Sequence, residues 1–530
     1  MTRHESDVCI IGAGISAAML AEKLLEKKPG LKITIVEAGR SLFDVENRMK
    51  YRQRRLDYNE NPWKGDYIGD MSAQGIISRT MAVGGSAMHW GGACNRFSEE
   101  DLRLKSLYGL AVDWPLDWKE LERYTCEAER RLGVAGEPGP FPEDARSEPY
   151  PMAPMPLTYN LRRLKEESER SGIPFWSTPQ AKNTKPYDGR PECVRCGTCA
   201  ICPTGARYSP DFTFKRMLTA KKITLHDQTL VRKLVLEEGS STRVASAQAV
   251  SLKPGGETVE YRARRFVLTA GYAWTSHLLL LSACSRFPQG LANASSGLVG
   301  RYMTGHNWVT AQMEVPYVIY PGMNETHALL SRQYFRCKPD SGLYARHDLR
   351  IWESAVGREP RLRDSRGKIL LGDALAADWK TRATLKGTAR LRAYYDTHPD
   401  RDSRLTLDSG AKNRFGDPLP KIEHKLDGPA EARLGATRSH IIGVFEKLAK
   451  ANNGKVFAIS DGGYQDHPCG GTRMGSDPAQ SVCDSYGRTH DHENLYCAGA
   501  PTLPTAGCTN GTLTFVALTL RTADRMAESS

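Results

Sequence analysis

The chain has 530 residues, 40% of them hydrophobic, and its 73 Lys and Arg against 61 Asp and Glu give a formal net charge of +12. This length suits a globular protein of roughly two to four domains with a large core. The basic residues form no stripe interleaved with aromatic residues, which argues against nucleic-acid binding. No apolar run approaches the ~18 residues of a transmembrane helix, and the start MTRHESDVCIIG is unlike a secretory signal. We therefore expect a cytoplasmic protein without a membrane span of its own.

The N-terminus predicts a nucleotide-binding βαβ unit. Apolar runs at 7–11 and 32–36 are expected to be parallel strands around a helix, and the turn between the first strand and the helix reads G-x-G-x-x-A. Gly12 allows the tight turn, Gly14 lets the backbone approach a pyrophosphate, and Ala17 allows close helix–strand packing. Glu37 follows the second strand, where a carboxylate takes the ribose hydroxyls. The motif does not separate FAD from NAD.

The middle of the chain carries dispersed signals. A glycine-rich run, VGGSAMHW, begins at residue 83, and residues 134–157 are rich in proline and predict a loop. Apolar and β-branched residues predict further strands at 222–225, 228–235, 264–269 and 404–407. The stretch 310–455 is mixed in pattern and shows no catalytic motif.

Four cysteines follow one another at every third position in the run CVRCGTCAICP: Cys193, Cys196, Cys199 and Cys202. The spacing allows one short loop to point several thiolates at one centre, and it resembles the iron–sulfur run of bacterial ferredoxins, whose last gap is one residue longer. Thiolates also suit zinc, although zinc sites usually split their ligands into two separated pairs. We favour iron–sulfur over zinc, and both over disulfides.

The C-terminal motifs carry a family resemblance. They are HPCGGTRMG from His467, NLYCAGA from Asn494 and NGTLT from Asn510, and GYAWTSHLLLLSA from Gly271 belongs with them. Together they resemble the motifs of the glucose–methanol–choline (GMC) oxidoreductases, with Gly511 where proline usually stands.

Two branches of that family share features with the chain. Bacterial glucose, fructose, sorbitol and gluconate dehydrogenases carry a cysteine run ending as CPTGARY does here at 202–208. The resemblance implies a 3Fe-4S or 4Fe-4S cluster, a small accessory subunit and a cytochrome-type acceptor. It also implies a periplasmic location if the chain is exported folded with a partner that carries a signal. Pyranose 2-oxidase bonds its flavin to a histidine at the place of His89, so the resemblance implies FAD that is either covalently bound there or held by contact.

The resemblance implies an α/β fold, with a Rossmann-like FAD-binding domain and a discontinuous α+β substrate domain. The expected FAD-binding ranges are 1–100, 200–310 and 456–530. The expected substrate-binding ranges are 101–199 and 311–455, with the cysteine loop at 193–202.

The predicted catalytic residues are His467 and Asn510. Oxidation of an alcohol by hydride transfer requires a base for the hydroxyl proton, and histidine titrates near neutrality. Asn510 can orient the same oxygen by a hydrogen bond. Without the family, the simpler interpretation is that His467 is a turn histidine and Asn510 a helix N-cap. The predicted cofactor-binding residues are Gly12, Gly14, Ala17, Glu37, Gly84, Gly85, Ser86, His89, Trp90, Val231 and Gly499.

Three functions compete at this point. The first is an FAD and iron–sulfur dehydrogenase of a sugar, glycoside or related alcohol, which passes electrons to an external acceptor such as a cytochrome. The second is an oxygen-using carbohydrate oxidase with a structural zinc at the cysteines. The third is a non-catalytic electron-transfer or assembly subunit, which the motif around His467 argues against.

Overall fold

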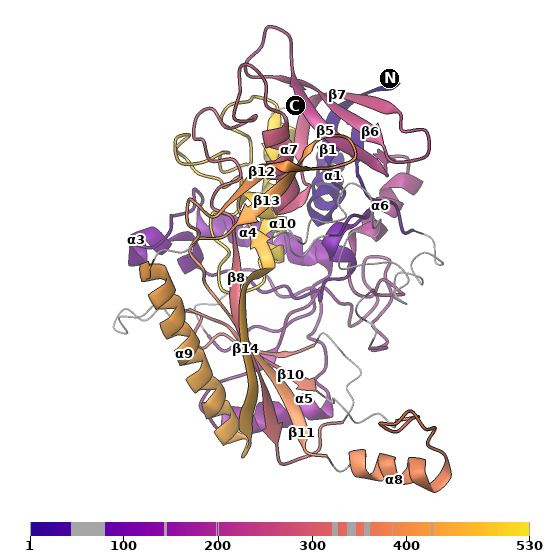
Figure 1. Ribbon diagram of the computed structural model, residues 1–530, viewed down its shortest axis with the longest axis vertical. Coiled ribbons are helices and arrows are strands. Elements are labelled where there is room, and N and C mark those ends of the chain that lie inside the picture. Colours follow the sequence, from indigo (N-terminus) through magenta and orange to yellow (C-terminus); the bar gives the residue numbers. More distant parts are fainter. Residues whose placement is uncertain are drawn as a thin grey trace.

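The computed structural model forms two regions, one above the other in Figure 1, each built on its own β-sheet. The N- and C-terminal segments lie together in the upper region. The structure describes residues 2–43, 80–141, 146–197, 199, 201–320, 327–336, 346–354, 361–383, 385–425 and 428–528.

The upper region contains a seven-stranded sheet. Its strands in spatial order are β4 (Ile223–His226), β2 (Ile33–Val36), β1 (Thr2–Ile11), β7 (Thr258–Leu268), β6 (Val244–Ser251) and β5 (Thr229–Leu236), and β15 (Leu495–Cys497) also pairs with β7. The pairs among β4, β2, β1, β7 and β15 are parallel, whereas β5, β6 and β7 pair antiparallel. Residues 8–11 and 33–36 are buried without alternation, as parallel strands covered on both faces require.

Helices cover this sheet. Helix α1 (Ile15–Lys27) follows β1 and packs against α10 (Thr512–Glu528), which in turn packs against α4 (Trp118–Leu132). The other helices in the described part of the chain are α3 (Leu104–Tyr108), α5 (Tyr159–Glu169), α6 (Pro210–Thr219), α7 (Gly271–Leu281), α8 (Gly372–Ala383) and α9 (Gly428–Ala451), with 3₁₀ turns η2 (Gly85–Met88), η3 (Glu99–Leu102) and η6 (Ala500–Thr502).

The lower region contains a six-stranded antiparallel sheet. Its strands in order are β14 (Lys455–Cys469), β8 (Thr304–Val315), β11 (Gly387–Tyr395), β10 (Leu349–Ser354), β9 (Leu329–Ser331) and β3 (Trp176–Ser177), while β12 (Arg404–Lys412) and β13 (Pro418–Glu423) form a separate ribbon. Leu349, Ile351 and Leu391 pack in one core cluster with α9. Because side chains alternate along a strand, the intervening residues of β10 and β11 face the other way, toward the cavity described below.

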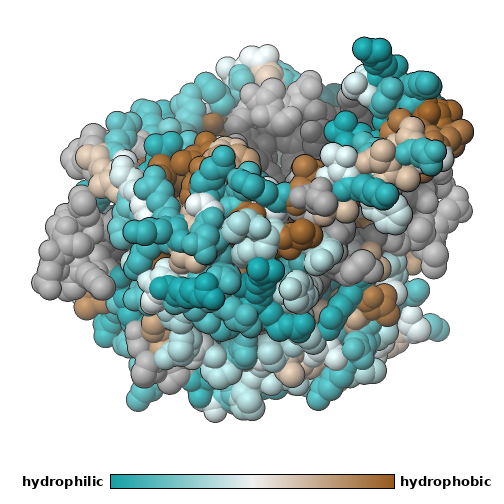
Figure 2. Space-filling model, turned by 90° about the horizontal axis from the view of Figure 1, so that it is seen from below, coloured by the Kyte–Doolittle hydropathy of each residue, from teal (hydrophilic) through white to brown (hydrophobic). Residues whose placement is uncertain are grey.

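The structure has strands at all six positions where the sequence predicts them. Five of these strands lie in the upper sheet, β1, β2, β4, β5 and β7, and the sixth is the ribbon strand β12. The expected domain ranges stay a prediction: β8 crosses their boundary at residue 310, and β14 lies in the lower sheet although its range was expected in the FAD-binding domain. Among the described helices, none is long and apolar enough to cross a membrane. The lower end of the molecule is mostly hydrophilic, with hydrophobic residues in small separate patches (Figure 2).

Candidate active site

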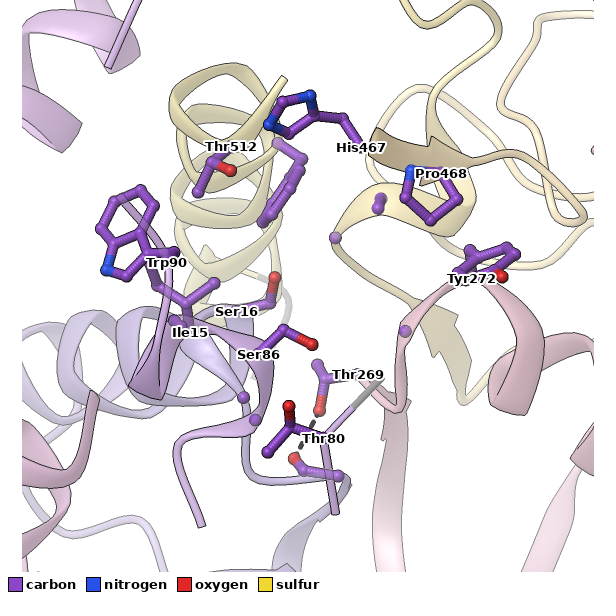
Figure 3. A pocket seen from close by; sticks show the side chains of 18 of the residues that line it. Ile15, Ser16, Thr80, Ser86, Trp90, Thr269, Tyr272, His467, Pro468 and Thr512 are labelled. Atoms are coloured by element: carbon purple, nitrogen blue, oxygen red, sulfur yellow. Dashed lines mark hydrogen bonds between the residues drawn. The ribbon is translucent and has the colours of Figure 1, made fainter. Parts of the chain in front are cut away.

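A cavity of about 750 Å³ extends from the end of β1 to the lower sheet. Its lining combines segments that are far apart in the sequence: the β1–α1 turn, η2, α7, β10, β11, the end of β14 and the start of α10. Figure 3 shows His467 and Thr512 on one side of this cavity and Thr80, Ser86 and Thr269 on the other.

The β1–α1 turn is shaped for a phosphate. Gly12 has φ +98°, and a Cβ there would lie 2.7 Å from Cα of Ala270, so the turn and this close approach both require glycine. Gly14 caps α1, and among the described atoms a Cβ at Gly14 would meet none within 4 Å. The helix N-terminus therefore faces open cavity, where its free N–H groups and its dipole favour an anion.

Glu37 lies at the end of β2, as the motif predicts, and lines the cavity. Its Oε2 accepts the N–H of Ala13 at 2.7 Å and its Oε1 accepts the N–H of Gly39 at 2.8 Å. Burial raises the pKa of Glu37 to about 7, and these N–H groups act in the opposite direction. The carboxylate is thus held in place beside the phosphate turn, where ribose hydroxyls can donate to it.

Replacing Glu37 by alanine is expected to weaken retention of the flavin nucleotide. Hydrogen bonds to a charged acceptor contribute ~1.5–3 kcal/mol, which corresponds to a rise in the dissociation constant of about 10- to 100-fold. Dialysis followed by absorption of the retained flavin measures it. Glu5→Ala removes an exposed carboxylate from β1 and should retain flavin like the wild type. Equal retention in both variants would contradict the assignment.

The glycine-rich run lies beside this turn. The N–H of Gly84 donates to the carbonyl oxygen of Ala13 at 2.7 Å, and Gly85, Ser86 and His89 line the cavity. His89 Nε2 lies 2.6 Å from Oγ1 of Thr80. Burial lowers the pKa of His89 to about 4, and the positive charge of Arg207 acts in the same direction. The imidazole is therefore neutral near pH 7, and its covalent link to the flavin stays a prediction.

Three other predicted cofactor residues also line the cavity: Trp90, Val231 and Gly499. The indole Nε1 of Trp90 donates to the carbonyl oxygen of Tyr208 at 2.8 Å, which fixes the ring. Ala17 is fully buried in the core around α1 and is not among the lining residues, so its contribution is the helix–strand packing expected of it.

His467 and Asn510 meet at the other end of the cavity. Nε2 of His467 lies 2.7 Å from Nδ2 of Asn510. His467 stands near the end of β14 with φ +54°, a conformation that a non-glycine residue adopts only when its surroundings impose it. The turn that follows needs glycine, because a Cβ at Gly470 would lie 2.2 Å from the carbonyl oxygen of Tyr302. Asn510 lies just before α10.

Five lining residues come from the stretch in which the sequence shows no motif, and four of them lie on β10 and β11: Arg350, Trp352, Arg390 and Tyr394. They occupy alternate positions of β10 and β11, and Trp352 and Arg390 are direct partners in the sheet. The alternation of polar or aromatic with small or aliphatic residues in LRIW and ARLRAY is the sequence signal that could have placed them on one face.

Comparison with known proteins decides the family. Models of the GMC oxidoreductases match residues 9–307 and 399–519, which together make up most of the chain. The chain belongs to the GMC oxidoreductases. The gap between the two matches, 308–398, contains the four lining residues of β10 and β11.

The chain is also similar to individual GMC enzymes over nearly its whole length. It is 31% identical to the fructose dehydrogenase large subunit of Gluconobacter japonicus, over 98% of this chain and 97% of that relative. It is 29% identical to paromamine 6'-oxidase of Streptomyces fradiae, over 98% and 91%. A solved structure of formate oxidase from Aspergillus oryzae superposes with a TM-score of 0.65 at 14% identity, covering 100% of this chain and 99% of that one.

Family and geometry agree on the cofactor. The glycine turn, the open helix N-terminus and the fixed carboxylate of Glu37 fit the adenosine diphosphate part of FAD, and the cavity continues past Ser86 and His89 to His467. This GMC oxidoreductase is an FAD-dependent enzyme that acts on CH–OH groups. The predicted fold class, a Rossmann-like FAD-binding domain with a discontinuous α+β substrate domain, is confirmed.

The cysteine run adjoins the same cavity. Cys199 is a lining residue, and Nζ of Lys182 lies 3.7 Å from its sulfur. The N–H of Arg207 contacts Sγ of Cys202 at 3.5 Å, while its guanidinium donates to the carbonyl oxygens of Met88 and Trp90.

The four sulfurs are not gathered around one centre in this structure. Cys202 is buried, Cys193 and Cys199 are half-buried, and Cys196 is exposed. Among the described residues no three His, Cys, Asp or Glu side chains are grouped as a metal site. Four thiolates are a suitable ligand set for an iron–sulfur centre. However, the loop as arranged in this structure does not bring them together as a metal site.

Proposed function

We propose that the chain is an FAD-dependent dehydrogenase of a sugar, glycoside or related alcohol, which passes electrons through an iron–sulfur centre at the cysteine run to an external one-electron acceptor. The observation that carries this proposal is the position of Cys199 on the wall of the cavity that contains His467 and Asn510. The predicted base and the cysteine run, through which electrons are proposed to leave, thus border one cavity.

The pair His467 and Asn510 performs the proton part of the reaction. A substrate hydroxyl that replaces the direct 2.7 Å contact between Nε2 and Nδ2 can donate its proton to His467. Its oxygen can accept the N–H of Asn510, which stabilises the negative charge that develops as the proton leaves. FAD, when bound, supplies the acceptor for the hydride of the same carbon.

The cysteine run supplies the second part of the proposal. An oxidase delivers both electrons from flavin to oxygen and needs no one-electron relay, whereas an iron–sulfur centre transfers single electrons. Closing of the short loop around the metal would bring the sulfurs of Cys193, Cys196, Cys199 and Cys202 together. Arg207 joins this run to the flavin side, because the same residue contacts Cys202 and the backbone beside His89.

Trp352 and Arg390 suit a sugar. The guanidinium of Arg390 lies 4.6 Å from the centre of the Trp352 ring, and both residues line the cavity. An indole face provides apolar contact for the C–H face of a sugar ring, and a guanidinium donates hydrogen bonds to its hydroxyls.

Trp352→Ala is expected to raise the sugar concentration at half-maximal rate about tenfold, because removing ~1–2 kcal/mol of contact weakens binding by about that factor. The limiting rate of flavin reduction should change less than threefold, roughly. The exposed Trp379 on α8 is the matched control, and Trp379→Ala should leave both values unchanged. A fall in the limiting rate alone would place Trp352 in the chemical step instead.

The relatives support proposals about partners and location. The name of the fructose dehydrogenase large subunit implies at least one other subunit in that enzyme. For this chain we propose a small accessory subunit and a cytochrome-type acceptor, with the protein cytoplasmic unless a signal-bearing partner exports it.

An oxygen-using oxidase with a structural zinc at the cysteines is the second candidate, favoured by the name of paromamine 6'-oxidase. Metal and acid-labile sulfide analysis of the purified holoenzyme separates the two. Iron and sulfide, with faster turnover on cytochrome c than on oxygen, support the dehydrogenase. Zinc without sulfide, with fast turnover on oxygen, supports the oxidase.

A further inference from the structure

A buried arginine stands directly behind the catalytic pair. Nη2 of Arg350 donates to Oδ1 of Asn510 at 2.5 Å and to Oγ1 of Thr509 at 3.1 Å. Arg350 is 4% exposed and lines the cavity. It lies on β10, whereas Asn510 precedes α10, so this contact ties the lower sheet to the helix that begins beside the pair.

The contact fixes the orientation of the Asn510 amide. Oδ1 also accepts from Nδ2 of Asn95 at 3.1 Å. Arginine carries donors only, so the amide oxygen must face Arg350 and the amide nitrogen must face His467. The opposite orientation would place the NH₂ group against the donors of Arg350.

The fixed amide in turn determines which ring nitrogen of His467 carries the proton. Nδ2 of Asn510 is a donor and lies 2.7 Å from Nε2 of His467. Nε2 must therefore be the unprotonated ring nitrogen, which is the state that a general base requires. The direction of every hydrogen bond from Arg350 to His467 follows from the chemistry of arginine.

Asp348 holds the arginine. Its Oδ2 accepts from Nε and Nη2 of Arg350 at 2.9 and 2.6 Å and from Oγ1 of Thr509 at 3.1 Å. Its Oδ1 accepts the N–H of Tyr394 at 2.9 Å. Asp348 is fully buried, so the pair is a hydrogen-bonded ion pair whose charges compensate each other.

We propose that Arg350 is a positioning residue for the proton transfer, acting through Asn510 on the substrate oxygen and on Nε2 of His467. The inference rests on the roles of His467 and Asn510 in the proposed function. It predicts that Arg350 contributes to the rate of flavin reduction only while Asn510 is present.

A double-mutant cycle tests this dependence. The limiting rate of anaerobic flavin reduction is measured, with the sugar that reduces the wild type fastest, in Arg350→Gln, Asn510→Ala and the combined variant. Arg350→Gln is expected to be about 10- to 100-fold slower, the equivalent of one charge-assisted hydrogen bond. The combined variant should match Asn510→Ala within about twofold, since the two residues act as one unit. Multiplying losses would overturn the proposal.

Further variants separate positioning from folding. Asp348→Asn combined with Arg350→Gln removes the ion pair as a whole and should be as slow as Arg350→Gln, with wild-type melting temperature and FAD content. Arg350→Lys should be faster than Arg350→Gln because it restores a charged donor. Arg264→Gln removes the same charge from an exposed side chain of β7, outside the cavity lining, and should reduce flavin at the wild-type rate. A slow Arg264→Gln, or an Asp348→Asn/Arg350→Gln variant that reduces flavin at the wild-type rate, would contradict the proposal.

The same measurements distinguish a failure of this inference from a failure of the proposed function on which it rests. If no sugar or alcohol reduces the wild-type flavin, the proposed function fails. If the wild type is reduced and the losses multiply, only the role of Arg350 fails.

Discussion

Replacing His467 by alanine is expected to slow the reduction of flavin by ~10²-fold or more, because general base catalysis contributes at least that much. FAD should bind as in the wild type, since the phosphate turn and Glu37 belong to β1, α1 and the end of β2, whereas His467 belongs to β14. Mixing oxidised holoenzyme with sugar without oxygen, and following the visible absorption of the flavin, isolates this step from reoxidation.

A matched histidine controls for loss of an imidazole elsewhere. His4 lies on β1 and is not among the cavity residues, so His4→Ala should reduce its flavin at the wild-type rate. Unchanged single-turnover reduction in His467→Ala would refute the assignment of the base.

Serine in place of Cys199 or Cys202 is expected to abolish turnover with cytochrome c while leaving reduction of flavin by sugar almost intact. In the proposed function the hydride step uses His467 and Asn510, whereas transfer of single electrons to an outside protein uses the iron–sulfur centre. The two half-reactions are therefore measured separately, flavin reduction without oxygen and steady-state reduction of cytochrome c. Iron and acid-labile sulfide should fall in the same variants.

Cys284 is half-buried and lies outside the run, so Cys284→Ser should keep both half-reactions. Full turnover with cytochrome c in Cys199→Ser and Cys202→Ser would contradict the relay and favour the oxidase.

The fold of the nucleotide end could be predicted from the sequence because its constraints are local. Gly12 and Gly14 lie in one turn, and their effect on φ and on close approach operates within a few residues. Glu37 reaches that turn because β1 and β2 are neighbours in the sheet, a pairing that a short βαβ unit enforces. His467 and Asn510 were predicted from family motifs, and their 2.7 Å contact follows because β14 ends where α10 begins.

The substrate end could not be predicted in the same way. Arg350 and Asp348 carry no motif, and their meaning depends on antiparallel pairing of strands separated by long stretches of chain. Asn95 joins Asn510 across more than 400 positions. Charged residues at alternate strand positions usually indicate a solvated face, whereas here the face borders a cavity that a separate region of the fold closes.

For the cysteine run, the sequence predicts more than the structure shows. Its spacing predicts a shared centre, and the structure places Cys199 on the cavity wall without gathering the four sulfurs. Ligand geometry that depends on a bound metal is set by the metal as much as by the chain, because binding and local folding are coupled.

Anaerobic mixing of the oxidised holoenzyme with a panel of sugars and alcohols tests the central claim most directly. We predict that the visible absorption of the flavin is lost with at least one sugar, and that the loss slows by ~10²-fold or more in His467→Ala. A flavin that stays oxidised with every compound would contradict the account.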